Sequence, residues 1–409
     1  MMIRNVLAVS LLVLAPLACQ AQSLAGLWDG TILTDGAEIP FKMGISGEGS
    51  NVKGWFFNGE AKEVSNRGKL ENGVLSLDFD SYATNLRLTY KDGALSGQYG
   101  PITKKMLNIR AVRAKESKAA PAAGAPNISG IWDLMMKTKS AKGEDAWDLI
   151  IRQNGSAVTG AILRVDGDTG ELTGSWKDGK FTLSHFSGAR PSLLVITPQP
   201  DGSLEVGLTN THGFTPMKAL RPEVAKAQGL PMPADADTHT QVKDPTKPFT
   251  FSFPDLNGKV VSNTDARFNG KVVLVVITGS WCPNCHDEAP FLEKAYEKYK
   301  SQGLEIVALS FEEGDQQANP TRLKAFIEEY GIKYTVLLGG EPDSAKTKLT
   351  QAQNWDAWPT TFFVGRDGLV KAVHAGFPGP ASGELYKKET SEFTARVEKL
   401  LGTNESVRK

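Results

Sequence analysis

The stretch "VVLVVITGSWCPNCHDEAP", residues 272–290, decides the fold of the C-terminal part of this chain. It joins a continuous apolar run, typical of a buried strand, to a charged segment typical of a helix. Cys282 and Cys285 lie at the junction, and Pro283 takes the first helical position, where its missing N–H is harmless. We expect Cys282 at the exposed start of the helix, where free backbone N–H groups and the helix dipole favour a thiolate. Cys285 should be shielded, one turn further in.

The spacing of the two cysteines is compatible with disulfide exchange, a metal site or, through "CPNCH", a c-type haem. A haem needs a distal ligand and a helical pocket, and zinc needs more ligands than one cysteine pair. We therefore interpret His286 as a partly exposed helix residue and expect no cofactor and no metal. A peroxidatic cysteine requires an upstream proline that "ITGSWC" lacks, which makes a thiol peroxidase only a distant alternative.

Strand-like and helix-like segments alternate after this stretch, which predicts βαβ units and an α/β domain. Apolar runs predict the strands, and charged periodic segments predict the helices. The predicted strands lie at 272–278, 304–311, 335–338 and 360–364, and the predicted helices at 290–300, 321–330 and 344–353, followed by a hairpin turn at 367–368 and a closing helix at 383–401.

Two motifs carry a family resemblance: "WCPNC" after a strand, and "WPTTFFVGRDG" further along the chain. Together they resemble the thioredoxin fold and, within it, the TlpA/ResA-like thiol-disulfide oxidoreductases of the bacterial cell envelope, over about residues 245–401. The resemblance implies that Pro359 is a cis-proline facing the cysteines and that Glu288 is a buried carboxylate used in proton transfer. It also implies substrate contacts for the residues around these motifs, namely Trp281, Trp358 and Thr360.

We therefore expect a protein thiol-disulfide oxidoreductase in which Cys282 attacks a disulfide and Cys285 resolves the mixed disulfide. Glu288 lies three residues after Cys285, on the same helix face, which favours proton transfer with Cys285. The resemblance implies a reductase of disulfide-containing envelope proteins, with apocytochrome c as one candidate. It further implies a membrane thiol donor of the CcdA/DsbD type that recharges the enzyme.

The first half of the chain contains an internal repeat. "GLWDGTI" from Gly26 returns as "GIWDLMM" from Gly130, "GSNVKGWFFNGE" as "GSAVTGAILRVDGD", and "LENGVLSLDF" as "WKDGKFTLSHF", in the same order. Alternating apolar residues and Gly-containing turns predict antiparallel meanders, and roughly eight strands per copy would suit a small closed barrel. The Gly-x-Trp openings resemble lipocalin-like barrels, with Trp28 and Trp132 expected as core plugs. These β domains leave a second function class open, a ligand- or partner-binding envelope protein.

The N-terminal "MMIRNVLAVSLLVLAPLACQAQS" predicts an export signal cleaved after Ala21, because its apolar run is too short to span a bilayer. The "PLAC" within it resembles a lipobox, so lipid anchoring through Cys19 is an alternative. Both point to the periplasm or cell envelope. Lys plus Arg equals Asp plus Glu at 46 each, and no block of like charge occurs, which argues against nucleic acid as a partner.

The sequence thus predicts a multidomain chain, with two repeated antiparallel, barrel-like β domains followed by an α/β thioredoxin-like domain. Two linkers are expected to be extended and solvated, including the cluster Asp235, Asp237 and His239. The predicted order is a signal peptide at 1–21, the first β copy at 22–113, a linker at 114–127, the second β copy at 128–220, a linker at 221–244, the thioredoxin-like (redoxin) domain at 245–402 and a tail at 403–409.

Overall fold

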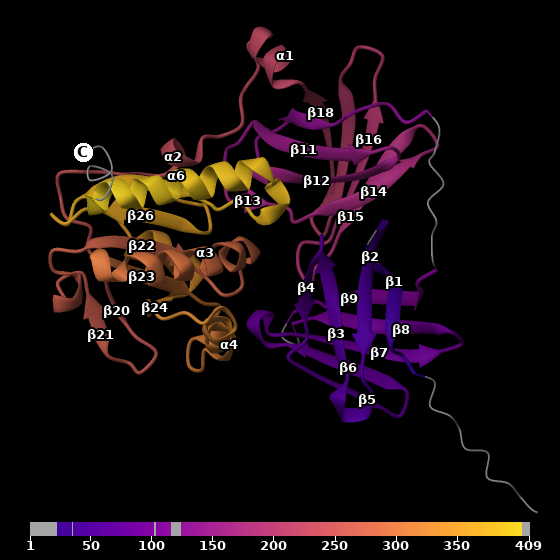
Figure 1. Cartoon of the computed structure of the whole chain (residues 1–409), viewed down its shortest axis with the longest axis horizontal. Helices are drawn as coiled ribbons and strands as arrows, with labels where there is room; N and C mark the ends of the chain where they lie inside the picture. Colours follow the sequence, from indigo (N-terminus) through magenta and orange to yellow (C-terminus); the bar gives the residue numbers. More distant parts are fainter. Residues whose placement is uncertain (1–22, 35, 102–103, 116–123, 403–409) are drawn as a thin grey trace, which may run out of the picture.

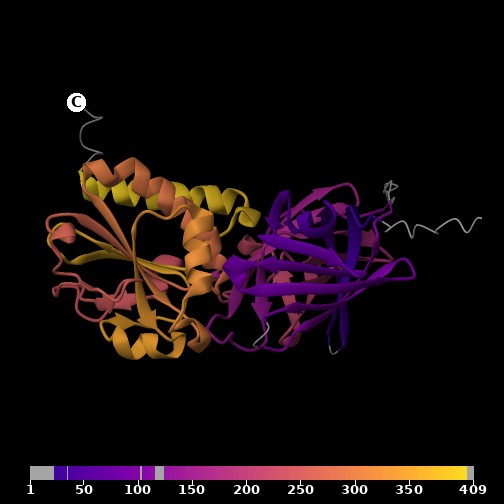
Figure 2. The ribbon, with the colours of Figure 1, turned by 90° about the horizontal axis from the view of Figure 1, so that it is seen from below.

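The computed structural model describes residues 23–34, 36–101, 104–115 and 124–402. The predicted signal peptide with Cys19 and Ala21, the middle of the first predicted linker and the predicted tail lie outside these residues. Two β bodies lie beside an α/β body (Figure 1), and the view from below shows the α/β body on one side and the β bodies on the other (Figure 2). Within the described residues, no helix is long and apolar enough to cross a bilayer.

The first β copy is one antiparallel sheet that forms an open half-barrel. Its strands pair in the order β4-β3-β2-β1-β9-β8-β7-β6-β5, so β4 and β5 are edges that do not pair with each other. The N–H of Ser65, just after β4, donates to the carbonyl of Gly54 in β3 at 2.8 Å. The sheet is therefore not the closed barrel that its strand count predicts. Its strands are β1 (Gly26–Thr34), β2 (Ala37–Ser46), β3 (Lys53–Asn58), β4 (Ala61–Val64), β5 (Arg67–Glu71), β6 (Val74–Phe79), β7 (Thr84–Lys91), β8 (Ala94–Gly100) and β9 (Leu107–Arg113).

The second β copy is a closed barrel. Its strand β11 pairs with both β10 and β12, which closes the ring, and the short β13 extends from β12 as a hairpin arm. Closure leaves no exposed edge in the ring. The strands are β10 (Gly130–Met136), β11 (Ala146–Asn154), β12 (Ala157–Arg164), β13 (Gly167–Asp168), β14 (Leu172–Lys177), β15 (Lys180–His185), β16 (Ser192–Pro198), β17 (Leu204–Asn210) and β18 (Gly213–Leu220).

A tryptophan in the first strand plugs each copy. Trp28 and Trp132 are buried, and their indole N–H groups donate to carbonyls four residues earlier at 3.0 and 2.9 Å. A guanidinium lies over each ring, that of Arg113 at 4.4 Å and that of Arg221 at 3.7 Å from the ring centroid. The prediction that both tryptophans are core residues is confirmed.

The α/β body is built on a five-stranded sheet in the order β24-β23-β22-β26-β27. The strands β22, β23 and β24 are parallel, whereas β26 runs antiparallel to β22 and β27 antiparallel to β26. The central β22 is buried at every position, as its continuous apolar run predicts. The five strands are β22 (Val272–Thr278), β23 (Leu304–Phe311), β24 (Thr335–Gly340), β26 (Thr360–Val364) and β27 (Val370–Ala375), and a separate hairpin pairs β20 (Ser252–Pro254) with β21 (Val260–Ser262).

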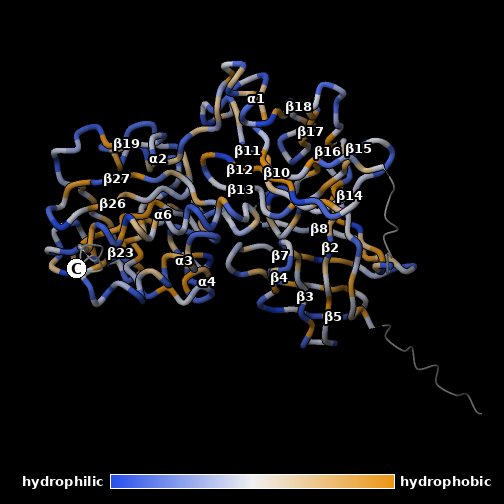
Figure 3. The backbone as a smooth tube through the Cα atoms, turned by 45° about the horizontal axis from the view of Figure 1, so that its top comes forward, coloured by the Kyte–Doolittle hydropathy of each residue, from blue (hydrophilic) through white to orange (hydrophobic). Residues whose placement is uncertain are grey.

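Helices α3 (Pro283–Tyr299) and α6 (Glu384–Leu401) pack on one face of this sheet, and α4 (Thr321–Tyr330) packs against α3. Apolar residues follow the inner strands of each body (Figure 3). The predicted helix over 344–353 is wrong. Only α5 (Ala345–Lys348) forms there, and β25 (Ala352–Gln353) then pairs with β19 (Gln241–Val242).

The second predicted linker is not an extended, solvated segment. It contains α1 (Pro222–Ala227) and α2 (Ala236–His239), and α2 lies against β27. Asp237 accepts two hydrogen bonds from Arg396 at 3.0 and 2.7 Å and lies 2.8 Å from Nδ1 of His374. These ion pairs fix the segment on the α/β body, which is why the solvated interpretation fails.

The two β copies share a core through one loop of the second copy. Phe186, in the loop between β15 and β16, belongs to the core cluster of the first copy. Its ring lies 5.0 Å from that of Phe41 and 4.9 Å from that of Phe56. The hydroxyl of Tyr99 in β8 also donates to the carbonyl of Gly188 at 2.8 Å. This loop, residues 186–191, therefore ties the second copy to the first.

Candidate active site

The two cysteines lie at the start of α3, where the chain leaves the central strand. Cys282 is the N-cap residue with an extended backbone, and Cys285 lies in the first turn. Both thiols are free and buried, with exposed fractions of 4 % for Cys282 and 1 % for Cys285. The expectation that Cys282 is exposed is therefore wrong, because the β region covers the start of α3.

The two thiols differ in acidity. Burial alone would raise the pKa of the Cys282 thiol, but hydrogen bonds from the side chain and backbone of Cys285, together with the charge of Arg190, lower it below its usual value. Burial and the neighbouring Cys282 sulfur raise the pKa of the Cys285 thiol well above its usual value. Cys282 is thus the sulfur that ionises first, which a nucleophile requires.

The segment before β26 faces Cys282. The Trp358–Pro359 peptide bond is cis, and the Sγ atom of Cys282 lies 3.5 Å from the carbonyl oxygen of Trp358. The hydroxyl of Thr360 donates to the carbonyl of Ala357 at 2.8 Å, and Thr360 is fully buried. The structure therefore brings Cys282, Trp358 and Pro359 together, while the Thr360 side chain is turned toward its own chain.

Aromatic rings surround this segment. The rings of Trp281 and Trp358 pack edge to face with centroids 5.2 Å apart, and the indole N–H of Trp281 donates to the carbonyl of Phe311 at 2.9 Å. Trp281 is also one wall of a cleft of about 1010 Å³ to which both β copies and the α/β body contribute. Trp281 is thus the predicted substrate contact that faces open space.

Glu288 lies behind the cysteines, buried with an exposed fraction of 1 %. The Thr361 hydroxyl donates to its Oε1 at 3.0 Å. Burial raises the pKa of the Glu288 carboxyl to about 8, and the Cys282 charge adds to that rise, whereas the Thr361 hydrogen bond opposes it. Glu288 and Cys285 line the same small cavity of about 10 Å³. The structure thus places a desolvated carboxyl and Cys285 on the same cavity.

His286 is buried rather than partly exposed, so that interpretation is wrong. Its Nε2–H donates to the carbonyl of Ser280 at 2.9 Å, its Nδ1 accepts from the hydroxyl of Tyr330 at 2.9 Å, and its ring stacks on Tyr82 of the first β copy at 4.0 Å. Burial lowers the pKa of His286 to about 3, so the imidazole is neutral. With both ring nitrogens engaged, His286 connects the two bodies.

A buried carboxylate that the sequence reasoning missed holds the loop before the cysteines. Glu312 is fully buried and accepts from the backbone N–H and hydroxyl of Ser280 at 2.9 and 2.7 Å and from Ser310 at 2.7 Å. It pairs with the buried Arg322 at 2.9 Å. The sequence feature that could have indicated Glu312 is an acidic residue directly after a predicted parallel strand. Functional sites of α/β proteins lie at the carboxyl ends of such strands. No group of three His, Cys, Asp or Glu suited to a metal ion occurs among the described residues.

The second β copy covers the cysteines with its hairpin arm, the turn between β12 and β13. Gly167 forms a parallel bridge with Phe377, just after β27. The amide of Asn284, which lies between the cysteines, donates to the carbonyl of Asp166 at 2.6 Å. The arm therefore hydrogen-bonds to the Cys-x-x-Cys segment itself.

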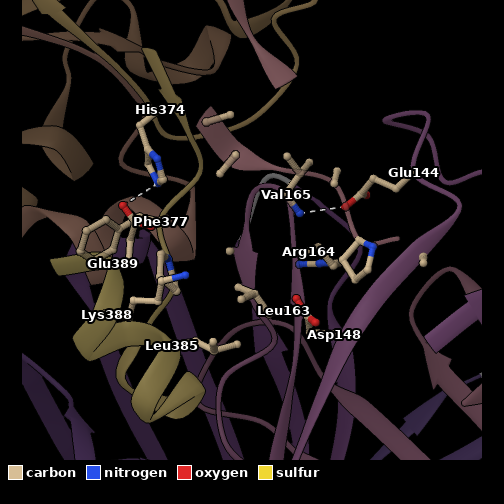
Figure 4. A pocket seen from close by; sticks show the side chains of 17 residues that line it. Glu144, Asp148, Leu163, Arg164, Val165, His374, Phe377, Leu385, Lys388 and Glu389 are labelled. Carbon is tan, nitrogen blue, oxygen red and sulfur yellow. Dashed lines mark hydrogen bonds and ion pairs between the residues drawn. The ribbon is translucent and has the colours of Figure 1, made fainter. Parts of the chain in front are cut away.

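A cavity of about 150 Å³ lies behind this arm, between the second β copy and α6 (Figure 4). His374 and Glu389 line one side, 3.3 Å apart, and Val165 lines the other, with its N–H donating to Glu144 at 2.8 Å. Neither cysteine lines the cavity. The contact between the second copy and the α/β body is thus incompletely packed on this side.

Residues 225–373 match the AhpC/TSA family. The chain is 30 % identical over 149 residues to the thiol-disulfide oxidoreductase ResA of Bacillus thuringiensis subsp. konkukian (strain 97-27), an overlap of 36 % of this chain and 74 % of that protein. It is 31 % identical over 126 residues to ResA of Bacillus subtilis (strain 168), which covers 31 % of this chain and 64 % of that protein.

Among solved structures, a thiol:disulfide interchange protein of the thioredoxin family from Chlorobium tepidum TLS is similar, at 21 % identity and a TM-score of 0.31, covering 39 % of this chain and 99 % of that chain. The thioredoxin domain of a thiol-disulfide oxidoreductase from Bacteroides vulgatus is similar at 25 % identity and a TM-score of 0.28, covering 38 % and 99 % respectively.

Proposed function

This chain belongs to the ResA family of thiol-disulfide oxidoreductases, and we propose on that basis that Cys282 and Cys285 are its redox pair. The observation that carries the proposal is the arrangement of the two sulfurs. Cys282 lies at the start of α3, 3.5 Å from the Trp358 carbonyl, and has the lowered pKa, while Cys285 behind it has the raised one. Cys282 is thus suited to attack a substrate disulfide, and Cys285 remains protonated until it resolves the mixed disulfide.

The reaction proceeds in two exchanges. The Cys282 thiolate attacks one sulfur of a substrate disulfide, forms a mixed disulfide and releases the other substrate sulfur as a thiolate that takes up a proton. The Cys285 sulfur, once deprotonated, attacks Cys282, which closes the Cys282–Cys285 disulfide and releases the second substrate thiol. The substrate gains two electrons and two protons, and the enzyme dithiol loses them. Trp281 and the Trp358–Pro359 segment are the proposed substrate contacts.

Glu288 is the proposed proton acceptor for Cys285. Its pKa of about 8 has the Cys282 charge as one cause, and that charge disappears when the mixed disulfide forms. The carboxyl then ionises more readily at the moment when Cys285 must lose its proton. The shared cavity with Cys285 supports this role, because both side chains line it.

The proposed setting is the cell envelope. The apolar N-terminal segment supports export, with lipid anchoring through Cys19 as the alternative. We further propose that the enzyme works as a reductase on disulfide-containing envelope proteins and is recharged by a membrane thiol donor. The family relationship supports this direction.

Trapping tests the redox assignment. A Cys285→Ser variant should accumulate mixed disulfides with a disulfide substrate such as insulin, because its Cys282 attacks but nothing resolves the product. A Cys282→Ser variant should accumulate almost none. Equal trapping by the two variants, read on non-reducing gels, would contradict the assignment of attacking and resolving sulfurs.

The Glu288 role has its own test. Glu288→Gln keeps the size of the side chain but cannot take a proton, so it should slow the second exchange at least ~10-fold and leave the first unchanged. Stopped-flow tryptophan fluorescence separates the two steps. Thr361→Val, which removes only the hydrogen bond to Glu288, is the matched control and should change the second step much less. Wild-type release by Glu288→Gln across a pH series would show that Glu288 has no part in the proton transfer.

A further inference from the structure

The loop of residues 186–191 in the second β copy reaches from the first copy to the cysteines. Its Phe186 end is fixed in the core of the first copy, as described above. Its Arg190 end has a left-handed backbone (φ 51°) and is held by the hydroxyl of Ser192, which donates to the Arg190 carbonyl at 3.0 Å. The loop is thus anchored on both sides of Arg190, which fixes the direction of that side chain.

The Arg190 side chain, 17 % exposed, points into the candidate active site. Its Nη1 donates to the side-chain oxygen of Asn284 and to the carbonyl of Asp168, and its Nη2 lies 3.5 Å from the carboxylate of Asp287. Asn284 and Asp287 flank Cys285 on α3. A permanent positive charge from another domain is therefore hydrogen-bonded to the Cys-x-x-Cys segment.

Several charged groups surround Cys282, and they differ in sign. Asp166 on the hairpin arm raises the pKa of the thiol, and Arg190, whose effect is the smaller of the two, lowers it. Asp166 is itself paired with Lys142 and Arg164. Burial raises the pKa of Asp287 to about 7, so this counterion of Arg190 is only partly ionised at neutral pH. Other titratable groups near Arg190 and the cysteines include Cys285, His286, Glu288, Asp168, His185, Tyr82 and Glu63.

We propose that Arg190 is a positioning residue of the redox site, supplied by the second β copy to hold Cys282 in its thiolate form. The inference rests on the proposed function in taking Cys282 as the attacking sulfur. The guanidinium stabilises the negative charge through space and fixes the Asn284 amide between the two cysteines. Stabilising the thiolate also stabilises the reduced enzyme, so Arg190 raises the reduction potential of the pair.

Replacement of Arg190 in the full-length protein tests this. The ultraviolet absorbance of the thiolate is followed over a pH series, and the same titration with Cys282→Ser added is subtracted. Arg190→Gln keeps a hydrogen-bond donor but loses the charge, so the Cys282 midpoint should rise by about one pH unit. Arg190→Lys keeps the charge and should move the midpoint much less. The reduction potential of Arg190→Gln should fall by about 30 mV, the equivalent of a tenfold change in equilibrium constant.

Arg152→Gln is the matched control. Arg152 also belongs to the second copy and contacts the α/β body, through the carbonyl of Ala381 at 2.9 Å, but it touches no part of the Cys-x-x-Cys segment. An equal shift in the Arg152 variant would show that loosened docking, not the Arg190 charge, moves the midpoint, and would overturn the proposal. An unchanged midpoint in Arg190→Gln, or equal shifts in the Gln and Lys variants, would overturn it too.

Arg190→Met repeats the test with an apolar side chain in case the Gln variant does not fold, and its midpoint is read in the same way. The titration needs no substrate. A shifted midpoint in a protein that exchanges no disulfides would therefore support the Arg190 proposal and refute the proposed function.

Discussion

The two β copies carry the same hairpin in the same place, and each hairpin docks on the next domain along the chain. In the first copy the hairpin joins β3 to β4, and Asn58 at its tip accepts from the backbone N–H of Glu171 in the second copy at 2.9 Å. In the second copy it joins β12 to β13, and Asp166 accepts from Asn284 in the α/β body at 2.6 Å. The repeated pattern sets the position of the hairpin, and the residues at its tip decide which surface it meets.

The largest expected effect tests whether the two cores are equivalent. Trp28→Ala and Trp132→Ala should each cost about 3–5 kcal/mol of unfolding free energy, because each removes a buried ring and its hydrogen bond to the chain. Urea unfolding followed by circular dichroism measures both. Costs that differ by more than about twofold would mean that the open half-barrel and the closed barrel do not use their tryptophans alike.

The next effect separates the two hairpin tips. A Cβ on Gly167 would lie 2.4 Å from the Phe377 carbonyl oxygen and close to Asn284, so Gly167→Ala should push the arm off the active site. Alkylation of Cys282 by iodoacetamide in the reduced protein should then speed up about tenfold, the equivalent of ~1.4 kcal/mol of lost docking.

Gly59→Ala is the matched change in the first copy. The three atoms nearest to its Cβ would all belong to the Glu171 carboxylate, at 3.0 to 3.2 Å, and this flexible side chain can move aside. It should leave the alkylation rate within a factor of two of the wild type. Equal rates for the Gly167 and Gly59 variants would mean that the second copy does not control access to Cys282.

The smallest expected effect is a pH dependence of the stability of the protein that arises from Glu63 in the first copy. Burial raises the pKa of Glu63 in β4 to about 7, and the nearby Glu329 of α4 adds to the rise. The folded protein therefore binds this proton more tightly than the unfolded chain, so the stabilising contribution is complete below pH ~4.5 and is lost as the pH rises through 7.

Glu63→Gln has no proton to lose and should melt a few degrees higher than the wild type (~2–4 °C) at pH 8, with no gain near pH 4.5. Differential scanning calorimetry across the series measures this. Glu60→Gln, an exposed glutamate in the same hairpin, is the control and should show no such trend. A gain that is the same at both pH values would contradict the assignment to Glu63 ionisation.

Local sequence patterns predict most of the α/β body and the buried tryptophan in the first strand of each β copy. The apolar run of β22, the helix start at Cys282 and the buried tryptophans each have a signal within a few residues. The charged periodicity of segment 344–353 predicts a helix, whereas pairing with β19 makes its end a strand. Cys282 and His286 are buried for a related reason, since part of the surface that covers them belongs to another domain.

Phe186 and Arg190 could not be assigned from the sequence. Nothing near them in the chain marks a ring that enters the first copy's core or a guanidinium that reaches the cysteines. Both contacts depend on how whole domains dock, which local propensity does not encode. Glu312 is the intermediate case, because an acid at the end of a parallel strand is visible but its partner Arg322 lies beyond the next loop.

The near-complete burial of Cys282 also bears on how long the enzyme survives between turnovers. A thiolate open to solvent reacts with peroxide to sulfenic acid and then, irreversibly, to sulfinic acid. The lowered pKa of Cys282 favours this oxidation, whereas its exposed fraction of 4 % leaves little of the residue in contact with solvent. The β region thus limits the contact of Cys282 with solvent, and we expect its removal to speed the oxidation of this sulfur by peroxide.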